Sequence, residues 1–168
     1  YNVLIMPAYN EGLEVIEPAF QTVLDTTYDK KHLIIVFAYE ERGGAEIEKT
    51  AQTLKQRYGK AFHSFHLVKQ PKDLANEVVG KGGNVTYAGR WRQGYLEKQH
   101  IAFSNVIVTT MDCDNRPHKA YFDYLTYEYI VREDRKHLAY QPVCTFTNTI
   151  WAAPPPHRVL ATGHPRWP

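Results

Sequence analysis

The chain opens on the stretch that decides its fold, VLIMPAYNE at residues 3–11. Val3 to Met6 form a continuous apolar run, which is typical of a β-strand buried on both faces. We expect Pro7 to end this strand, because proline cannot donate to a strand ladder. The polar residues Tyr9, Asn10 and Glu11 follow at once. A buried strand that runs into a polar loop is what a parallel sheet with a binding site at its edge requires.

Short apolar runs and helical periodicity alternate along the rest of the sequence. Further strands are expected at residues 33–38, 62–68, 106–110 and 137–143. Helices are expected over 15–24 with Pro18 in the first turn, over 47–58, over 85–95, and from Pro117 to Tyr129. This alternation predicts an α/β fold with a doubly wound, mostly parallel sheet and helices on both faces. One domain is expected over residues 1–153, followed by an irregular Pro-rich tail over 154–168.

The composition is that of an ordinary globular protein with a formal net charge of +2. Its basic residues are scattered, so nucleic acid is not an expected partner. Cys113 and Cys144 form no CxxC pattern, and no apolar run reaches the roughly 18 residues that span a bilayer. A cytoplasmic location is therefore expected, either free or as the cytoplasmic domain of a membrane protein. The start at Tyr1 without Met suggests a fragment, so membrane association would come only through segments outside this chain.

Polar loops follow the first four predicted strands. They are residues 9–12, 40–44, 80–84 and 112–115. Ligands of open α/β sheets bind outside the carboxyl ends of the strands, so these four loops are expected to converge on one edge of the sheet.

Asp112 and Asp114 are the sharpest feature of these loops. In extended chain, residues two apart point the same way, so both carboxylates would face one side and Cys113 the other. Two such carboxylates repel each other unless a cation lies between them, and oxygen-only ligands suit Mg²⁺ or Mn²⁺. The alternative is that one or both aspartates cap the helix expected at Pro117.

The other loops each allow a functional and a structural interpretation. The glycines around Lys81 would let backbone N–H groups and the lysine approach an anion, or they form a flexible loop with a solvated lysine. Glu40 and Glu41 would bind a base or ribose, or they are solvated loop acids. Asn10 and Glu11 are by default a turn and a helix-dipole carboxylate. Neither a Walker A motif nor GxGxxG is present.

With these loops in view, the chain resembles glycosyltransferase family 2, which has a GT-A (Rossmann-like) fold, and in particular its bacterial cellulose-synthase-like members. The resemblance runs from about Val3 to Trp151. It rests on VLIMPAYNE at 3–11, GKGGN at 80–84 and VTTMDCD at 108–114, with paired glutamates at 40–41 and a YQP…N.IW pattern over 140–151. The order and spacing of these pieces are more specific than any one of them.

The resemblance implies a nucleotide diphosphate sugar as donor, with a UDP-sugar favoured, an unknown glycan or lipid-linked acceptor, and usually an inverting transfer that needs Mn²⁺ or Mg²⁺. It implies a nucleotide pocket lined by Pro7, Ala8, Tyr9 and Glu11, with Glu40, or Glu41 in another register, near the base. It also places Lys81 near the diphosphate, Asp112 at the ribose and metal, and Asp114 as the direct metal ligand. The family's catalytic base and QxxRW motif are not identifiable. A sugar nucleotidyltransferase and a non-catalytic nucleotide-sugar-binding or interaction module remain the alternatives.

Overall fold

The computed structural model describes residues 1–75 and 79–142. The chain divides after Arg135 into two compact units, and the sheet, its helices and the candidate site all belong to the first. The predicted domain boundary after residue 153 lies outside the described residues.

The first unit contains a four-stranded, all-parallel sheet with helices on both faces, as predicted. The elements in chain order are β1 (Asn2–Ala8), α1 (Leu13–Leu24), β2 (Leu33–Glu40), α2 (Gly44–Tyr58), β3 (Ser64–Gln70), α3 (Lys81–Lys98), β4 (Ile107–Thr110) and α4 (Tyr121–Val131), with short 3₁₀ turns at Lys30–His32, Glu41–Gly43, Phe103–Asn105 and Arg135–His137. The strand order is β3-β2-β1-β4. The chain therefore builds outward from β1 to β3 and then returns to the other side of β1, which makes the gap between β1 and β4 the topological switch point.

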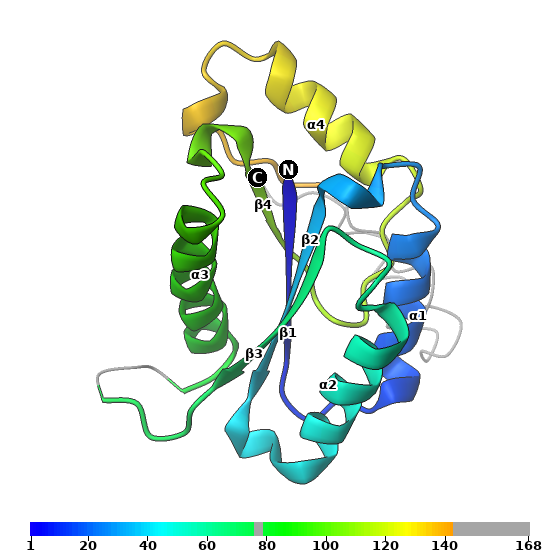
Figure 1. The fold of residues 1–168 in the computed structure, drawn as a ribbon, viewed down its shortest axis with the longest axis vertical. Coiled ribbons are helices and arrows are strands. Elements are labelled where there is room, and N and C mark those ends of the chain that lie inside the picture. Colours follow the sequence, from blue (N-terminus) through cyan, green and yellow to red (C-terminus); the bar gives the residue numbers. More distant parts are fainter. Residues whose placement is uncertain (76–78, 143–168) are drawn as a thin grey trace, which may run out of the picture. The chain divides into compact units, whose positions relative to one another are not determined.

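Helices cover both faces of the sheet (Figure 1), and an apolar cluster fills the space on each face. Alternate residues of β1 and β2 point to opposite faces. Leu4 and Phe37 face α1 and α2 in one cluster, whereas Val3 and Val36 face α3 in the other. β1 and β2 are buried along their whole length, which confirms the interpretation of their apolar runs.

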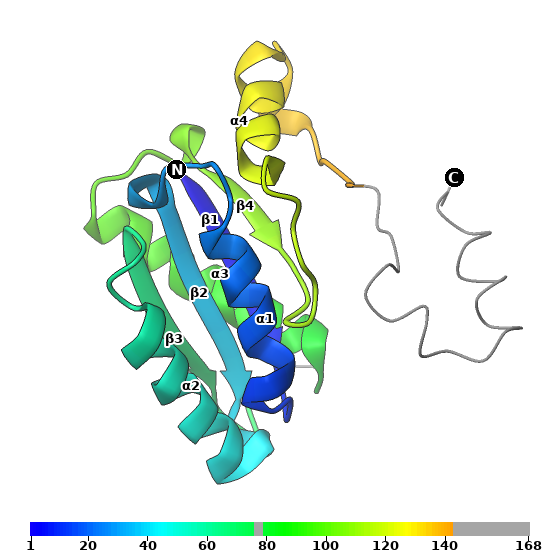
Figure 2. The ribbon, with the colours of Figure 1, turned by 90° about the vertical axis from the view of Figure 1, so that its right-hand side faces the viewer.

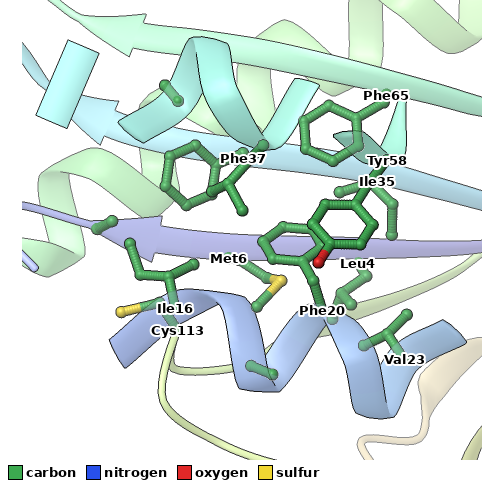
Figure 3. Packing of buried hydrophobic residues seen from close by; sticks show 14 of the residues in the cluster. Leu4, Met6, Ile16, Phe20, Val23, Ile35, Phe37, Tyr58, Phe65 and Cys113 are labelled. Carbon is green, nitrogen blue, oxygen red and sulfur yellow. The ribbon is translucent and has the colours of Figure 1, made fainter. Parts of the chain in front are cut away.

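A cluster of aromatic side chains fills the space between the sheet and the helices α1 and α2 (Figure 3). The Phe20 ring is fully buried and stacks on Tyr58 and Phe65, with centroids 5.6 and 5.5 Å away. Phe37 lies tilted against the same ring at 6.2 Å. Figure 2 shows α1 and α2 side by side over β2 and β3, the strands to which Phe37 and Phe65 belong.

Two prolines lie inside elements at whose ends they were expected. Pro7 was expected to end the first strand, and Pro18 to lie in the first turn of the first helix. Pro7 is within β1, paired with Ala38 of β2. The Ile5 carbonyl accepts a hydrogen bond from the Met111 N–H, so the polar backbone groups of Ile5 face β4. Residues two apart in a strand face the same side, so the Pro7 nitrogen also faces β4. The ladder with β4 has ended by then, at Ile5, so the missing N–H leaves no gap in the ladder. Pro18 lies in the middle of α1 rather than in its first turn, because the helix begins at Leu13.

Other boundaries also differ from the predictions. The expected glycine loop is the first turn of α3, which begins at Lys81. The last helix begins at Tyr121 and not at Pro117. His137 lies in a 3₁₀ turn and residues 138–142 form no strand, while Val143 lies outside the described residues. No helix in the described ranges has both the length and the apolarity to cross a bilayer.

Candidate functional site

The residues predicted to form the site lie where the topology places the carboxyl ends of the strands. Pro7 and Ala8 end β1 and are buried, whereas Tyr9 beyond them is 40% exposed. The backbone N–H of Tyr9 donates to the Glu11 carboxylate at 2.7 Å, so Glu11 closes a tight local turn. Glu40 is the last residue of β2 and is buried.

Lys81 and Asp112 come together across the switch point. Lys81 is the first residue of α3, and its ammonium donates to the Asp112 carboxylate beyond β4. Both side chains are about half exposed, so we expect this ion pair to exchange readily with a competing charge. This ion pair connects the start of α3 with the loop after β4. From the sequence, the two segments were related only because each follows a predicted strand.

Asp112 to Asn115 form a turn and not an extended segment, which corrects one step of the prediction. The Asn115 N–H donates to the Asp112 carbonyl at 3.0 Å, as in a β-turn. Cys113 is buried in the core, while Asp114 is exposed. Within the part of the chain that the structure describes, no residue bonds to the Asp114 carboxylate. The helix-cap alternative does not apply, because α4 begins at Tyr121 with Ala120 as its N-cap and has no side-chain cap.

Three carboxylates lie around the thiol of Cys113. Burial and, to a smaller extent, the negative charges of Glu11, Asp114 and Asp112 together raise the pKa of Cys113 to about 12. Glu11 follows β1 and the two aspartates follow β4, so acids from both sides of the switch point converge here. This concentration of negative charge would attract a cation.

The pKa of Cys113 leads to a prediction about its reactivity. The thiolate is the reactive form, and with this pKa only about one molecule in ten thousand is ionised at pH 8. In a Cys144→Ser background, we expect iodoacetamide to label Cys113 very slowly in native protein and quickly in urea, as followed by mass spectrometry. Rapid labelling of the native protein would contradict the burial of this side chain.

The carboxylate of Glu40 is held by Arg42, a residue that the sequence interpretation did not select. The Arg42 guanidinium donates to Glu40, and it also lies over the Tyr9 ring with 5.1 Å between its carbon and the ring centroid. These contacts join the loops after β1 and β2. The signal in the sequence was the arginine two residues after a strand-end acid, a spacing that is too common to be diagnostic.

A small, open pocket lies beside Glu40 and Arg42, at the ends of β2 and β3. Lys72 and Asp73 from the loop after β3 and Gly80 before α3 line its other side. Since Lys81 follows Gly80 and bonds to Asp112, the N-terminus of α3 connects this pocket to the acidic turn.

Gly43 lets the loop after β2 approach the loop after β1. A Cβ at this position would lie 1.8 Å from the Tyr9 carbonyl oxygen and 2.8 Å from Ile47 Cγ2. Its backbone is right-handed helical, with φ −70° and ψ −8°, so the obstacle to a side chain is contact and not torsion.

We therefore expect Gly43→Ala to lower the free energy of unfolding by about 1–3 kcal/mol, as measured by urea denaturation. Gly94→Ala is the matched control, because a Cβ there meets nothing within 4 Å inside α3. It should be neutral or stabilise by up to about 1 kcal/mol. Equal losses in both variants would contradict the close approach at Gly43.

Comparison with protein-family models and with curated proteins finds no match for this chain. The geometry at the switch point therefore carries the functional proposal.

The donor set at the switch point suits a hard cation. No group of three or more His, Cys, Asp or Glu side chains is placed to hold a metal ion among residues 1–75 and 79–142. Asp112 and Asp114 nevertheless offer carboxylate oxygens from one exposed turn. Mg²⁺ typically takes one or two carboxylates and completes its shell with phosphate oxygens and water. The two aspartates fit that mode of binding.

Proposed function

We propose that this chain is the donor-binding domain of a metal-dependent glycosyltransferase with the GT-A fold of family 2. Its ligand is a nucleotide diphosphate sugar, with a UDP-sugar favoured. The observation that carries the proposal is the meeting of Lys81 and Asp112 across the switch point. A cation on a helix N-terminus and an acidic turn face each other there, and a diphosphate with its metal ion needs both.

The diphosphate end of the donor would lie at the first turn of α3. Gly82 and Gly83 carry no side chains, and a Cβ at Gly82 would meet nothing within 4 Å, so a phosphate could approach the backbone there. Lys81 would exchange its bond to Asp112 for a phosphate oxygen. Asp112 and Asp114 would then hold Mn²⁺ or Mg²⁺, which when bound stabilises the negative charge of the departing diphosphate.

The nucleoside end would lie toward β2 and β3. Glu40 is a buried carboxylate whose charge is already balanced by Arg42, and it can accept from N–H or hydroxyl groups of a ligand. Tyr9 offers an exposed aromatic face at the mouth of the same region. Pro7 and Ala8, buried at the end of β1, would line the pocket next to Tyr9.

The residues of the candidate site account for donor binding and not for turnover. We assign no described residue as the base that deprotonates the acceptor. Accordingly we expect the chain by itself to bind donor weakly and to transfer or hydrolyse it little or not at all. The acceptor, a glycan or a lipid-linked glycan, would be recognised mainly outside these residues.

Titration calorimetry with UDP, with and without Mn²⁺, tests the proposal. We expect measurable binding that strengthens at least about tenfold when Mn²⁺ is present. The absence of any metal-dependent binding of UDP or GDP would overturn it. Release of pyrophosphate from UTP and a sugar 1-phosphate would instead show a nucleotidyltransferase, and the absence of any nucleotide effect on melting temperature would favour an interaction module.

A further inference from the structure

Asn84 is a buried polar side chain at the centre of the candidate site. It lies in the first turn of α3 and is 1% exposed. Its Nδ2 donates to the carbonyl of Ala38 at 2.9 Å and to that of Ala8 at 3.3 Å. One amide group thus joins the carboxyl ends of β1 and β2.

The orientation of this amide follows from its surroundings. Turning it over would place an oxygen against two carbonyl oxygens, so only the NH₂ group can face the strands. The Oδ1 atom is then buried without a hydrogen-bond partner among the described residues. A buried acceptor without a partner is costly. Asn84 is on the same buried side of α3 as Ala88 and Leu96, which are fully buried. An apolar residue at this position would avoid the unpaired acceptor, so stability alone does not explain the asparagine.

The same turn reaches a third strand. Lys81, three residues before Asn84, bonds to Asp112 after β4. Ala8 immediately precedes Tyr9, and Ala38 lies two residues before Glu40. The first turn of α3 consequently contacts the carboxyl ends of β1 and β2 and the turn after β4.

We propose that Asn84 is a positioning residue, which sets the separation of the Tyr9 and Glu40 loops and places Lys81 opposite Asp112. The inference rests on the proposed donor site for its functional meaning. Its structural part, the coupling of the three strand ends, stands whatever ligand binds there.

Two substitutions remove the donor with little change in size. Asn84→Asp replaces the NH₂ group with oxygen, and Asn84→Leu replaces the whole amide with an apolar group. Both should weaken UDP binding in the presence of Mn²⁺ by about tenfold or more, because small displacements of binding groups have large effects. Leu96→Ala is the control, since it opens a cavity in the same helix far from the strand ends. It should lower the melting temperature as much or more and change the UDP affinity less than about twofold.

NMR spectra of the variants without ligand test the positioning role of Asn84 independently of the proposed donor binding. In ¹⁵N-HSQC spectra, the amide signals of Tyr9, Glu40 and Lys81 should move in the Asn84 variants and stay in place in Leu96→Ala. If the wild-type chain does not bind UDP, the donor proposal fails, and these shifts alone decide the positioning role. Unmoved shifts, or Asn84 variants that bind UDP as wild type does, would overturn it.

If the Asn84 variants do not fold, the inference can still be tested in the wild-type protein. The side-chain NH₂ signals of Asn84 should be well dispersed, as expected for a hydrogen-bonded amide, and should shift when UDP and Mg²⁺ are added. Signals at the positions of a solvated asparagine would overturn the inference.

Discussion

Replacing Asp114 with asparagine is expected to remove the Mn²⁺-dependent part of UDP binding, a loss of about 100-fold in affinity if Asp114 is a direct ligand. The amide keeps the size of the side chain and loses its charge. Asp114 is exposed and has no hydrogen-bonding or ion-pair partner in the described ranges, so among those residues the substitution breaks no such bond. Calorimetry with UDP at saturating Mn²⁺ measures the effect directly.

The control for this variant is Asp134→Asn. Asp134 is an exposed acid in the turn after α4 and is not part of the candidate site. Its substitution should leave UDP affinity within about twofold. Addition of EDTA to wild type should reproduce the loss seen in Asp114→Asn, and a variant that still responds to Mn²⁺ as wild type does would exclude Asp114 as a ligand.

The largest effect on stability is expected for Phe20→Ala, at about 3–5 kcal/mol of unfolding free energy. The fully buried ring contacts side chains from β2, α2 and β3, so its removal leaves a cavity between α1 and the sheet. Urea denaturation followed by circular dichroism measures this loss. The total stability of a domain is commonly about 5–15 kcal/mol, so Phe20→Leu provides a milder variant if the alanine form does not fold.

Phe103→Ala is the matched control, because that ring is 50% exposed in a 3₁₀ turn. It should change the unfolding free energy by no more than about 0.5 kcal/mol. Similar losses in both variants would mean that the aromatic cluster around Phe20 does not hold the layers together.

The coarse fold could be predicted because its strands are buried on both faces. Such strands show as continuous apolar runs, and residues 33–38 lie wholly inside the observed β2. The predicted strands at 62–68 and 106–110 differ from β3 and β4 by one or two residues at their ends. The GT-A assignment is finer than these observations and stays a prediction.

Helix boundaries were less predictable, because contacts distant in sequence set them. Two glycines after Lys81 oppose a helix by about 1 kcal/mol each, yet α3 begins there. The Asn84 side chain binds two strand ends and its N–H bonds to the Gly80 carbonyl, which together anchor the turn. No local pattern contains that information.

The candidate site was predictable in outline and not in its connections. Topology brings strand ends together, so Lys81 and Asp112 were expected near each other and do form an ion pair. Arg42 and Asn84 were missed as site residues, since their roles depend on partners in other loops. For Asn84 the available signal was a polar residue four positions before Ala88 on the buried side of a helix.

Of the four strands that the structure describes, β4 is the last to be synthesised and the shortest, and this affects the order in which the sheet assembles. Asn2 pairs with Leu33 in β2 but with Ile107 in β4, so joining β4 closes a far longer loop of chain. Longer loops cost more entropy to close, and β4 adds only four paired positions in return. During synthesis, β1, β2 and β3 are complete before β4 leaves the ribosome, and the acidic turn after β4 joins them last. A ligand that bridges Lys81 and this turn would therefore stabilise the least secure strand of the sheet.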